Sequence, residues 1–135
     1  MSTLWMYAVV ALGGAAGTIA RYFVSGAAAN AFGQTFPWGT LIVNITGSFV
    51  IGFFATLTSP DGRLLVSGPT RQFVMIGICG GYTTFSSFSL QTLNLMRDSE
   101  WLYAGGNVVA SVAVCLFFVW LGAISAAFVN QLKGA

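Results

Sequence analysis

Four long apolar stretches follow one another along the chain, and a short polar segment separates each from the next. A helix needs about 20 apolar residues to cross the hydrocarbon core of a bilayer, and each stretch is long enough. The segments between them hold turn residues or charges, as in Gly33–Pro37, Ser59–Arg63 and Arg97–Glu100. The pattern predicts an all-α integral membrane protein, a single domain of residues 1–135 with transmembrane helices over about 4–31, 38–57, 71–96 and 101–129.

The composition fits a chain that folds in lipid rather than in water. Of the 135 residues, 56% are hydrophobic and only 6% are charged, whereas a soluble domain has about 25% charged residues. With no histidine and three side-chain carboxylates, we expect neither an enzyme nor an organic cofactor. A net charge of +2 offers no basic patch for nucleic acid. Cys79 and Cys115 lie in apolar stretches and are interpreted as packing residues, not as a disulfide.

Tryptophan and basic residues mark the ends of the predicted spans. Trp5, Trp38 and Trp101 each stand where a span begins, at the depth that an indole ring prefers. The first seven residues hold no lysine or arginine, so we expect the first span to remain in the protein rather than be removed as a signal peptide. Four spans place both termini on one side of the membrane. The basic residues then divide as Arg63, Arg71 and Lys133 against Arg21 and Arg97, a bias weak enough to permit insertion in either orientation.

The first two spans carry a few small and polar residues. Gly13 and Gly17 have the spacing that lets another helix approach closely. Arg21 lies roughly 26 Å along the first span, near the far interface, where it is either a snorkelling anchor or a cation that draws anions into a vestibule. Asn44 and Ser48 form a small polar face on the second span, which serves either as an interhelical contact or as a pore lining.

The third span is unusually rich in glycine and hydroxyl groups near its middle. Residues 77–89 hold three glycines and five serines or threonines. A glycine pair followed by Thr83 and Thr84 makes a poor helix interior, so we expect the helix to unwind there and expose carbonyl groups that can coordinate a cation. The following hydroxyl groups can donate to an anion. Phe85 and Phe88 share one face, either to offer their positive ring edges or simply to pack in a core.

The fourth span has a polar stripe at helical spacing. Tyr103, Asn107 and Ser111 follow one another at intervals of four residues, and Cys115 extends the stripe. None of these side chains carries a fixed charge. A site of neutral donors, ring edges and one peripheral arginine suits a small anion that accepts hydrogen bonds well.

The run Gly80–Ser89 closely resembles the third-helix motif of the Fluc (CrcB) fluoride channels. Residues 13–21 and 38–44 and the stripe of the fourth span also resemble that family, so the likeness covers essentially the whole chain. The resemblance implies a passive F⁻-selective channel in the bacterial inner membrane. It further implies an antiparallel dual-topology homodimer with two pores, the third helix broken near its middle, and a Na⁺ ion at the dimer centre.

The resemblance also implies roles for individual residues. Backbone carbonyls of Gly80 and Thr83 would hold Na⁺, and Arg21 would line the aqueous vestibule. The residues placed along the fluoride pore are Asn44, Thr84, Phe85, Ser87, Phe88, Tyr103 and Ser111. The chain departs from the family at Gln91, where many members have glutamate, and at Asn107, where a small hydroxyl residue is common. We assign no essential role to Gln91.

Two other classes of membrane protein share some of these features with the channel. A small multidrug resistance transporter has a similar length and four spans, but it needs a glutamate within the membrane, whereas Asp61, Asp98 and Glu100 lie between the spans here. A non-transporting membrane subunit would explain the glycine faces, but not the hydroxyl groups of the third span.

Overall fold

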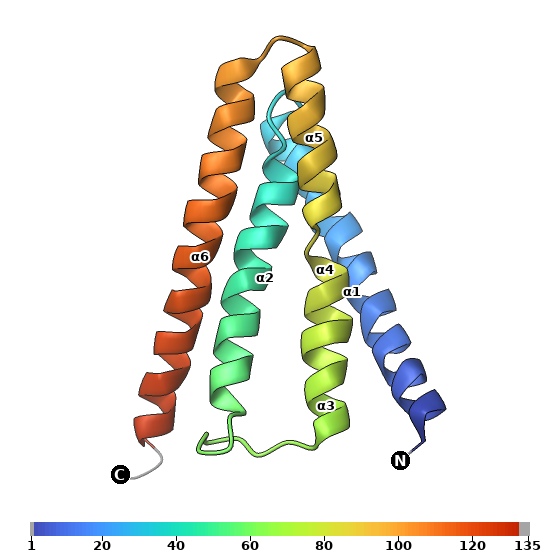
Figure 1. Cartoon of the computed structure of the whole chain (residues 1–135), viewed down its shortest axis with the longest axis vertical. Coiled ribbons are helices and arrows are strands. Elements are labelled where there is room, and N and C mark those ends of the chain that lie inside the picture. Colours follow the sequence, from blue (N-terminus) through green and yellow to red (C-terminus); the bar gives the residue numbers. More distant parts are fainter. Residues whose placement is uncertain (1, 133–135) are drawn as a thin grey trace.

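The computed structural model describes residues 2–132, which are helical wherever they are regular, with no strand among them. Lys133 lies outside the described residues. Four helical spans are long and apolar enough to cross a membrane, so the predicted all-α fold is confirmed. These spans are α1 (Thr3–Phe32), α2 (Trp38–Leu57), a third made of α3 (Gly68–Gln72), η1 (Phe73–Cys79), α4 (Gly80–Tyr82) and α5 (Phe85–Arg97), and α6 (Trp101–Gln131) (Figure 1).

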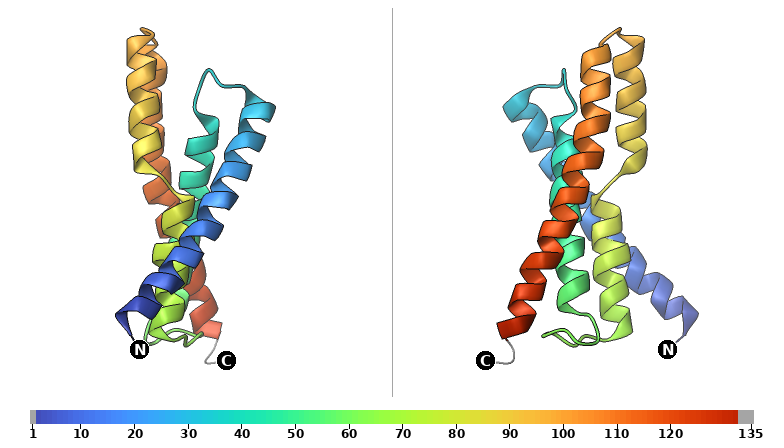
Figure 2. Two further views of the ribbon diagram at one scale, coloured as in Figure 1. Left: turned by 90° about the vertical axis from the view of Figure 1, so that its right-hand side faces the viewer. Right: turned by 60° about the vertical axis from the view of Figure 1, so that its left-hand side comes forward.

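The spans run in alternating directions. The start of α1, the end of α6 and the connection between α2 and α3 lie at one end of the molecule, as an even number of spans requires (Figure 1). The α1–α2 and α5–α6 connections lie at the other end, and α1 crosses the third span obliquely (Figure 2). Trp38 and Trp101 are the first residues of their helices and Trp5 lies in the first turn of α1, which confirms the predicted placement of tryptophan.

The third span begins slightly earlier than predicted because Ser67 caps it. The Ser67 hydroxyl accepts a hydrogen bond from the Thr70 N–H at 3.3 Å, and Pro69 occupies the first turn. A serine cap followed by proline is a favoured way to start a helix. Phe73–Cys79 then forms a π-helix, which the sequence pattern did not predict.

Glycines allow α1 to pack closely against the third span. A Cβ atom added to Gly13 would lie 2.5 Å from the Phe73 carbonyl oxygen, and one added to Gly17 would collide with the Ile78 carbonyl oxygen. On the facing side, a Cβ atom on Gly77 would lie 2.8 Å from the Gly13 Cα atom. The predicted use of Gly13 and Gly17 as a helix-packing surface is therefore confirmed.

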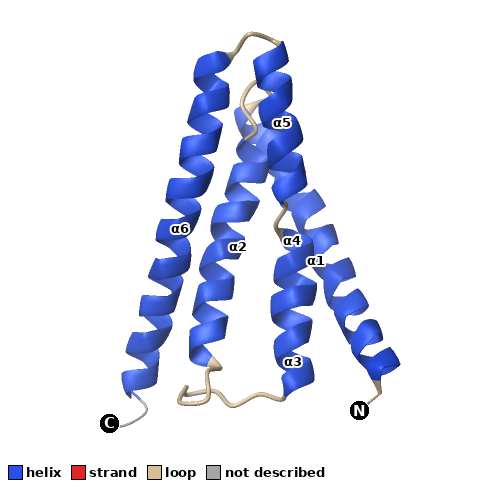
Figure 3. Cartoon of the chain, viewed as in Figure 1, coloured by secondary structure: helices blue, strands red, loops and turns tan. Residues whose placement is uncertain are grey.

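The third span breaks at two threonines. Thr83 (φ −87°, ψ 159°) and Thr84 (φ −154°, ψ 120°) are extended, and they form the short loop between α4 and α5 in Figure 3. The expected break near the middle of the third span is confirmed; it falls at the two threonines, since Gly80 and Gly81 belong to α4. Gly81 serves close packing instead, because an added Cβ atom would lie 2.5 Å from the Gly14 carbonyl oxygen.

Polar side chains of α3 and α6 hold the C-terminal end of α2, at the end of the molecule where α1 begins. Arg71 Nη2 donates to the Ala55 carbonyl at 3.0 Å, and Asn130 Nδ2 donates to the Thr56 carbonyl at 3.0 Å. Asn130 Oδ1 also accepts the Arg63 N–H at 2.7 Å. These donors satisfy carbonyl groups at the C-terminal end of α2 that lack a helical partner.

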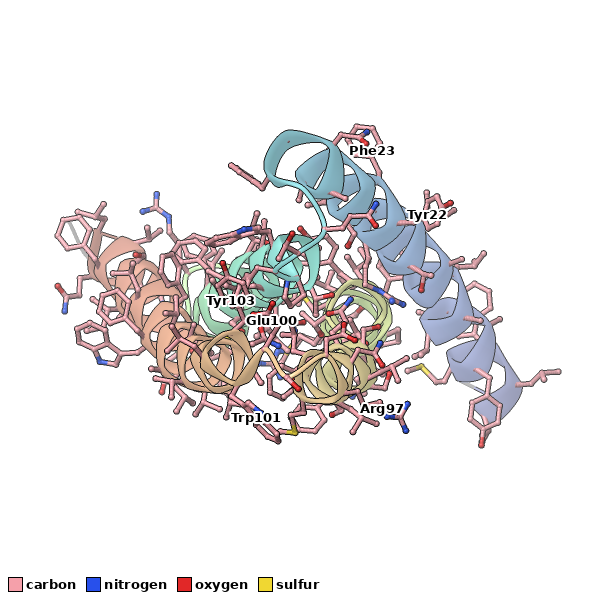
Figure 4. The ribbon with its side chains drawn as sticks, turned by 90° about the horizontal axis from the view of Figure 1, so that it is seen from above. Tyr22, Phe23, Arg97, Glu100, Trp101 and Tyr103 are labelled. Carbon is pink, nitrogen blue, oxygen red and sulfur yellow. The ribbon has the colours of Figure 1, made fainter. Side chains whose placement is uncertain are left out.

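Most residues of the four spans are not buried within the chain. Between 11% and 28% of the most apolar part of each span is buried. Tyr22 and Phe23 on α1 are 85% and 75% exposed and lie on its outer side, away from the other helices (Figure 4). Such a surface requires lipid or another protein chain to cover it.

Candidate functional site

Asn44 on α2 holds the break in the third span. Its Nδ2 atom donates to the Thr84 carbonyl at 3.0 Å, and its Oδ1 atom accepts the Thr84 N–H at 2.8 Å. In an unbroken helix that N–H would donate to the Gly80 carbonyl. One amide side chain thus satisfies both backbone groups of an extended residue, and one Nδ2 hydrogen is left over. Of the two predicted roles for Asn44, the interhelical contact is confirmed.

The break brings two helix ends of opposite polarity together. Thr84 caps the start of α5, because its Oγ1 atom accepts the Ser87 N–H at 3.2 Å and its hydroxyl donates to Ser87 Oγ at 3.2 Å. The N–H groups in the first turn of α5 carry partial positive charge, whereas the carbonyl groups at the end of α4 carry partial negative charge. An anion and a cation can therefore both be stabilised near this point.

A groove of about 430 Å³ opens beside the break. No charged side chain lines it. Phe85 and Phe88 lie at its edge with ring centroids 5.3 Å apart, but Phe88 is only 9% exposed whereas Phe85 is 77% exposed. The groove gathers most of the predicted site residues, together with both free cysteines: Asn44, Gly80, Thr83, Thr84, Phe85, Phe88, Ser111, Cys79 and Cys115.

Some residues of the polar stripe on α6 line the groove and others do not. Ser111 lines the groove, and its hydroxyl is 3.5 Å from Asn107 Oδ1, to which it donates. Tyr103 does not line the groove. It is 41% exposed, and its ring stands edge-on to Phe36 in the α1–α2 connection, with centroids 6.0 Å apart. Ser87 also lies outside the groove lining and meets the site through its contacts with Thr84.

Arg21 contacts the residues just before the break. Its Nε atom donates to the Gly81 carbonyl at 3.0 Å, and Thr18 Oγ1 is 3.5 Å from the same oxygen. Gly81 lies about halfway along the third span, and the position of Arg21 near the far interface stays a prediction. The guanidinium group caps the end of α4, where positive charge is favourable.

Sequence reasoning gave no role to two residues that support the site. Thr18 lies one turn before Arg21, and Thr92 lies one turn after Phe88 and donates to the Phe88 carbonyl at 2.8 Å. Both follow the spacing of three or four residues that places side chains on one helix face. This spacing is the feature of the sequence that could have pointed to Thr18 and Thr92.

A second cavity of about 340 Å³ lies between the α1–α2 connection and α5. Its lining is more polar, with Ser25, Thr35, Asn94 and Asp98 among its residues. Gln91 also lines it, and among the described residues its Oε1 atom is the one buried side-chain oxygen or nitrogen without a hydrogen-bond partner. The three side-chain carboxylates of the chain lie outside the helices.

Comparison with known proteins gives consistent matches over most of the chain. The family described as CrcB-like protein, Camphor Resistance (CrcB), matches residues 8–123. A fluoride-specific ion channel FluC from Opitutus terrae is 61% identical over 130 residues, covering 96% of this chain and 98% of that protein. The proteins of that name from Rhodospirillum rubrum and Methylocella silvestris are 59% and 56% identical, covering 93% and 100% of this chain and 97% and 100% of their own lengths.

Proposed function

The chain belongs to the CrcB-like family, and from this premise we propose that it is a passive, fluoride-selective ion channel. It lets F⁻ leave the cytoplasm down its electrochemical gradient and so protects the cell against fluoride. The observation that carries the proposal is the uncharged groove at the broken helix, where the start of α5, a free amide hydrogen and two phenylalanine rings meet.

Neutral donors and ring edges favour a small anion without trapping it. Fluoride accepts hydrogen bonds strongly, and the Asn44 amide has one N–H left after it binds Thr84. The edges of Phe85 and Phe88 carry the positive part of the ring quadrupole. Because no charged side chain of the described residues lines the groove, an ion that enters can also leave.

The remaining polar residues extend the path on either side of the rings. Thr84, Ser87, Tyr103 and Ser111 contribute hydroxyl groups, and the Ser111 proton, which points to Asn107, turns toward the anion by rotation of the hydroxyl. Arg21 lines an aqueous vestibule while it holds the Gly81 carbonyl, and its positive charge raises the local concentration of anions.

The functional unit is an antiparallel dual-topology homodimer with two pores in the bacterial inner membrane. Phe85 supports this assembly, because a side chain proposed to contact the ion is 77% exposed in one protomer and needs a second surface to complete its surroundings. The weak difference in basic residues between the two ends permits both orientations.

Sodium fits the carbonyl groups at the break. The Thr84 N–H donates to Asn44 rather than to the Gly80 carbonyl, and Thr83 is extended, so the oxygens of Gly80 and Thr83 are available as hard ligands. Na⁺ held by these residues and their copies in the partner would supply a fixed positive charge at the dimer centre.

Passive flow suffices for this function. HF crosses bilayers uncharged and dissociates in the more alkaline cytoplasm, and a channel then releases the trapped F⁻. A small multidrug resistance transporter would need a carboxylate within a span to exchange protons, whereas Asp61, Asp98 and Glu100 lie in the connections. A non-transporting subunit would leave the paired rings and the free amide hydrogen beside the break without use.

Efflux from liposomes tests the proposal. Purified protein is reconstituted into vesicles loaded with KF, a K⁺ ionophore is added, and external fluoride is followed with an electrode. KCl-loaded vesicles read with a chloride electrode are the control. We expect rapid F⁻ loss without Cl⁻ loss, and a folded protein that releases neither ion would contradict the proposal.

A further inference from the structure

Asn107 is the least exposed of the buried polar side chains in the described residues, at 2%. It lies on α6, in the stripe that also holds Ser111, but it does not line the groove beside the break. A buried amide behind the groove can hold a lining residue in place without touching the ion. The contacts of Asn107 indicate which lining residue it holds.

A chain of hydrogen bonds leads from Asn107 to the turn that carries Phe88. Asn107 Nδ2 donates to Thr92 Oγ1 at 2.9 Å, and the Thr92 hydroxyl donates to the Phe88 carbonyl at 2.8 Å. Thr92 is 6% exposed, so water does not compete for these bonds. Each hydroxyl and amide group in the chain has a defined direction as donor or acceptor.

This link is the one hydrogen bond between a residue of α5 and a residue of α6 within residues 2–132. At the start of α5, Asn44 fixes Thr84. With one fixed point at Thr84 and another at Thr92, the rotation of α5 about its own axis is determined between them. Phe88 lies between these two points, so its direction follows from both.

Asn107 also orients a hydroxyl group that lines the groove. Ser111 Oγ donates to Asn107 Oδ1 at 3.5 Å, so the Ser111 proton points to the amide, and the hydroxyl must rotate before it can donate to an anion in the groove. A residue with only a hydroxyl at position 107 could not bind Thr92 and Ser111 with separate donor and acceptor atoms in this way.

We infer that Asn107 is a positioning residue for conduction, which acts through Thr92 on Phe88. The inference rests on the proposed function, since it concerns the rate at which that path conducts. It predicts that removal of the Thr92 hydroxyl slows fluoride efflux although Thr92 does not line the groove.

Comparison of Thr92→Val with Thr92→Ser distinguishes the effect of the hydroxyl group on efflux from the effect of the side-chain shape. We expect Thr92→Val to form the same oligomer as the wild type and to lose fluoride about fivefold to tenfold more slowly, as the net effect of one buried hydrogen bond suggests. Thr92→Ser keeps the hydroxyl and should conduct at close to the wild-type rate. Ser125→Ala, which removes a hydroxyl elsewhere on α6, is the matched control.

A double variant separates positioning from folding. Thr92→Val with Asn107→Leu removes both partners, leaves no buried group unpaired between them and should restore stability. If Asn107 positions Phe88, this variant forms the wild-type oligomer but still conducts slowly. Wild-type efflux from either Thr92→Val or the double variant would overturn the inference. Failure of both variants to assemble would also overturn it, because the hydrogen bond between Asn107 and Thr92 would then be a folding contact. Absence of efflux from the wild type would instead refute the proposed function.

Discussion

Exchange of Asn44 for aspartate changes the chemistry of the site while almost preserving its shape. The carboxylate can still accept the Thr84 N–H, as Oδ1 does at 2.8 Å. It cannot donate to the Thr84 carbonyl, which now receives Nδ2 at 3.0 Å, and it has no hydrogen left for an anion. We expect Asn44→Asp to abolish fluoride flux.

The size of the effect follows from the lost bond and the new charge. Loss of one hydrogen bond costs about 1 kcal/mol net. An anion that approaches within about 4 Å of the carboxylate meets a further ~4 kcal/mol of repulsion at an effective dielectric constant of about 20. Since each 1.4 kcal/mol corresponds to roughly a factor of ten, conduction should fall by more than about a thousandfold.

Fluoride efflux from liposomes measures this loss. The matched control is Asn130→Asp at the end of α6. It introduces the same charge and removes the same kind of donor, in this case the one that binds the Thr56 carbonyl of α2. Asn130 does not line the groove, so its variant should conduct like the wild type.

Flux from the Asn44→Asp protein within tenfold of the wild type would refute the reasoning. It would mean that the anion does not pass the Asn44 amide, whatever the role of Asn44 in holding the break. Equal losses in the Asn44 and Asn130 variants would also refute it, because the effect would then belong to any added carboxylate.

Three further predictions address the rings, the helix packing and the cation. Phe85→Ile and Phe88→Ile should each slow fluoride efflux strongly with the oligomer intact in size-exclusion chromatography, and normal flux in both would remove the aromatic role. Gly17→Val should prevent assembly, because its Cβ atom would collide with the Ile78 carbonyl, whereas Gly14→Ala meets open space and should assemble; equal yields would contradict the packing argument. Replacement of Na⁺ by N-methylglucamine should lower the melting temperature of the purified protein, and an unchanged value would argue against the Na⁺ site.

Hydropathy located the spans because a bilayer restricts the chain to helices with their backbone groups paired internally. Hydropathy does not mark the break within the third span, whereas the glycine pair followed by Thr83 and Thr84 indicated it to within a few residues. Gly80 and Gly81 have the lowest helix propensity in that region, yet they are helical, because Gly81 lies against α1. The break falls at Thr83 and Thr84, where Asn44 replaces the helical hydrogen bonds from a position 40 residues away in sequence.

The groove could be predicted as a set of residue types but not as a geometry. The spacing of Phe85 and Phe88 placed both rings on one face, but their unequal exposure depends on how α5 turns after the break. The contact of Arg21 with Gly81 could not be predicted, because distance along a helix does not show how that helix crosses its neighbour. The π-helix is a shift in hydrogen-bond register that leaves no mark on the pattern of apolar residues.

The double hydrogen bond from Asn44 to Thr84 also bears on how the pathway behaves in time. The extended residue has both backbone groups satisfied by a side chain of its own protomer, so it gains nothing by refolding into the helix when an ion departs. This pair of hydrogen bonds therefore gives the segment no reason to alternate between two forms. Passage of an ion along the proposed path would then need no change in this segment, only the removal and return of the ion's water.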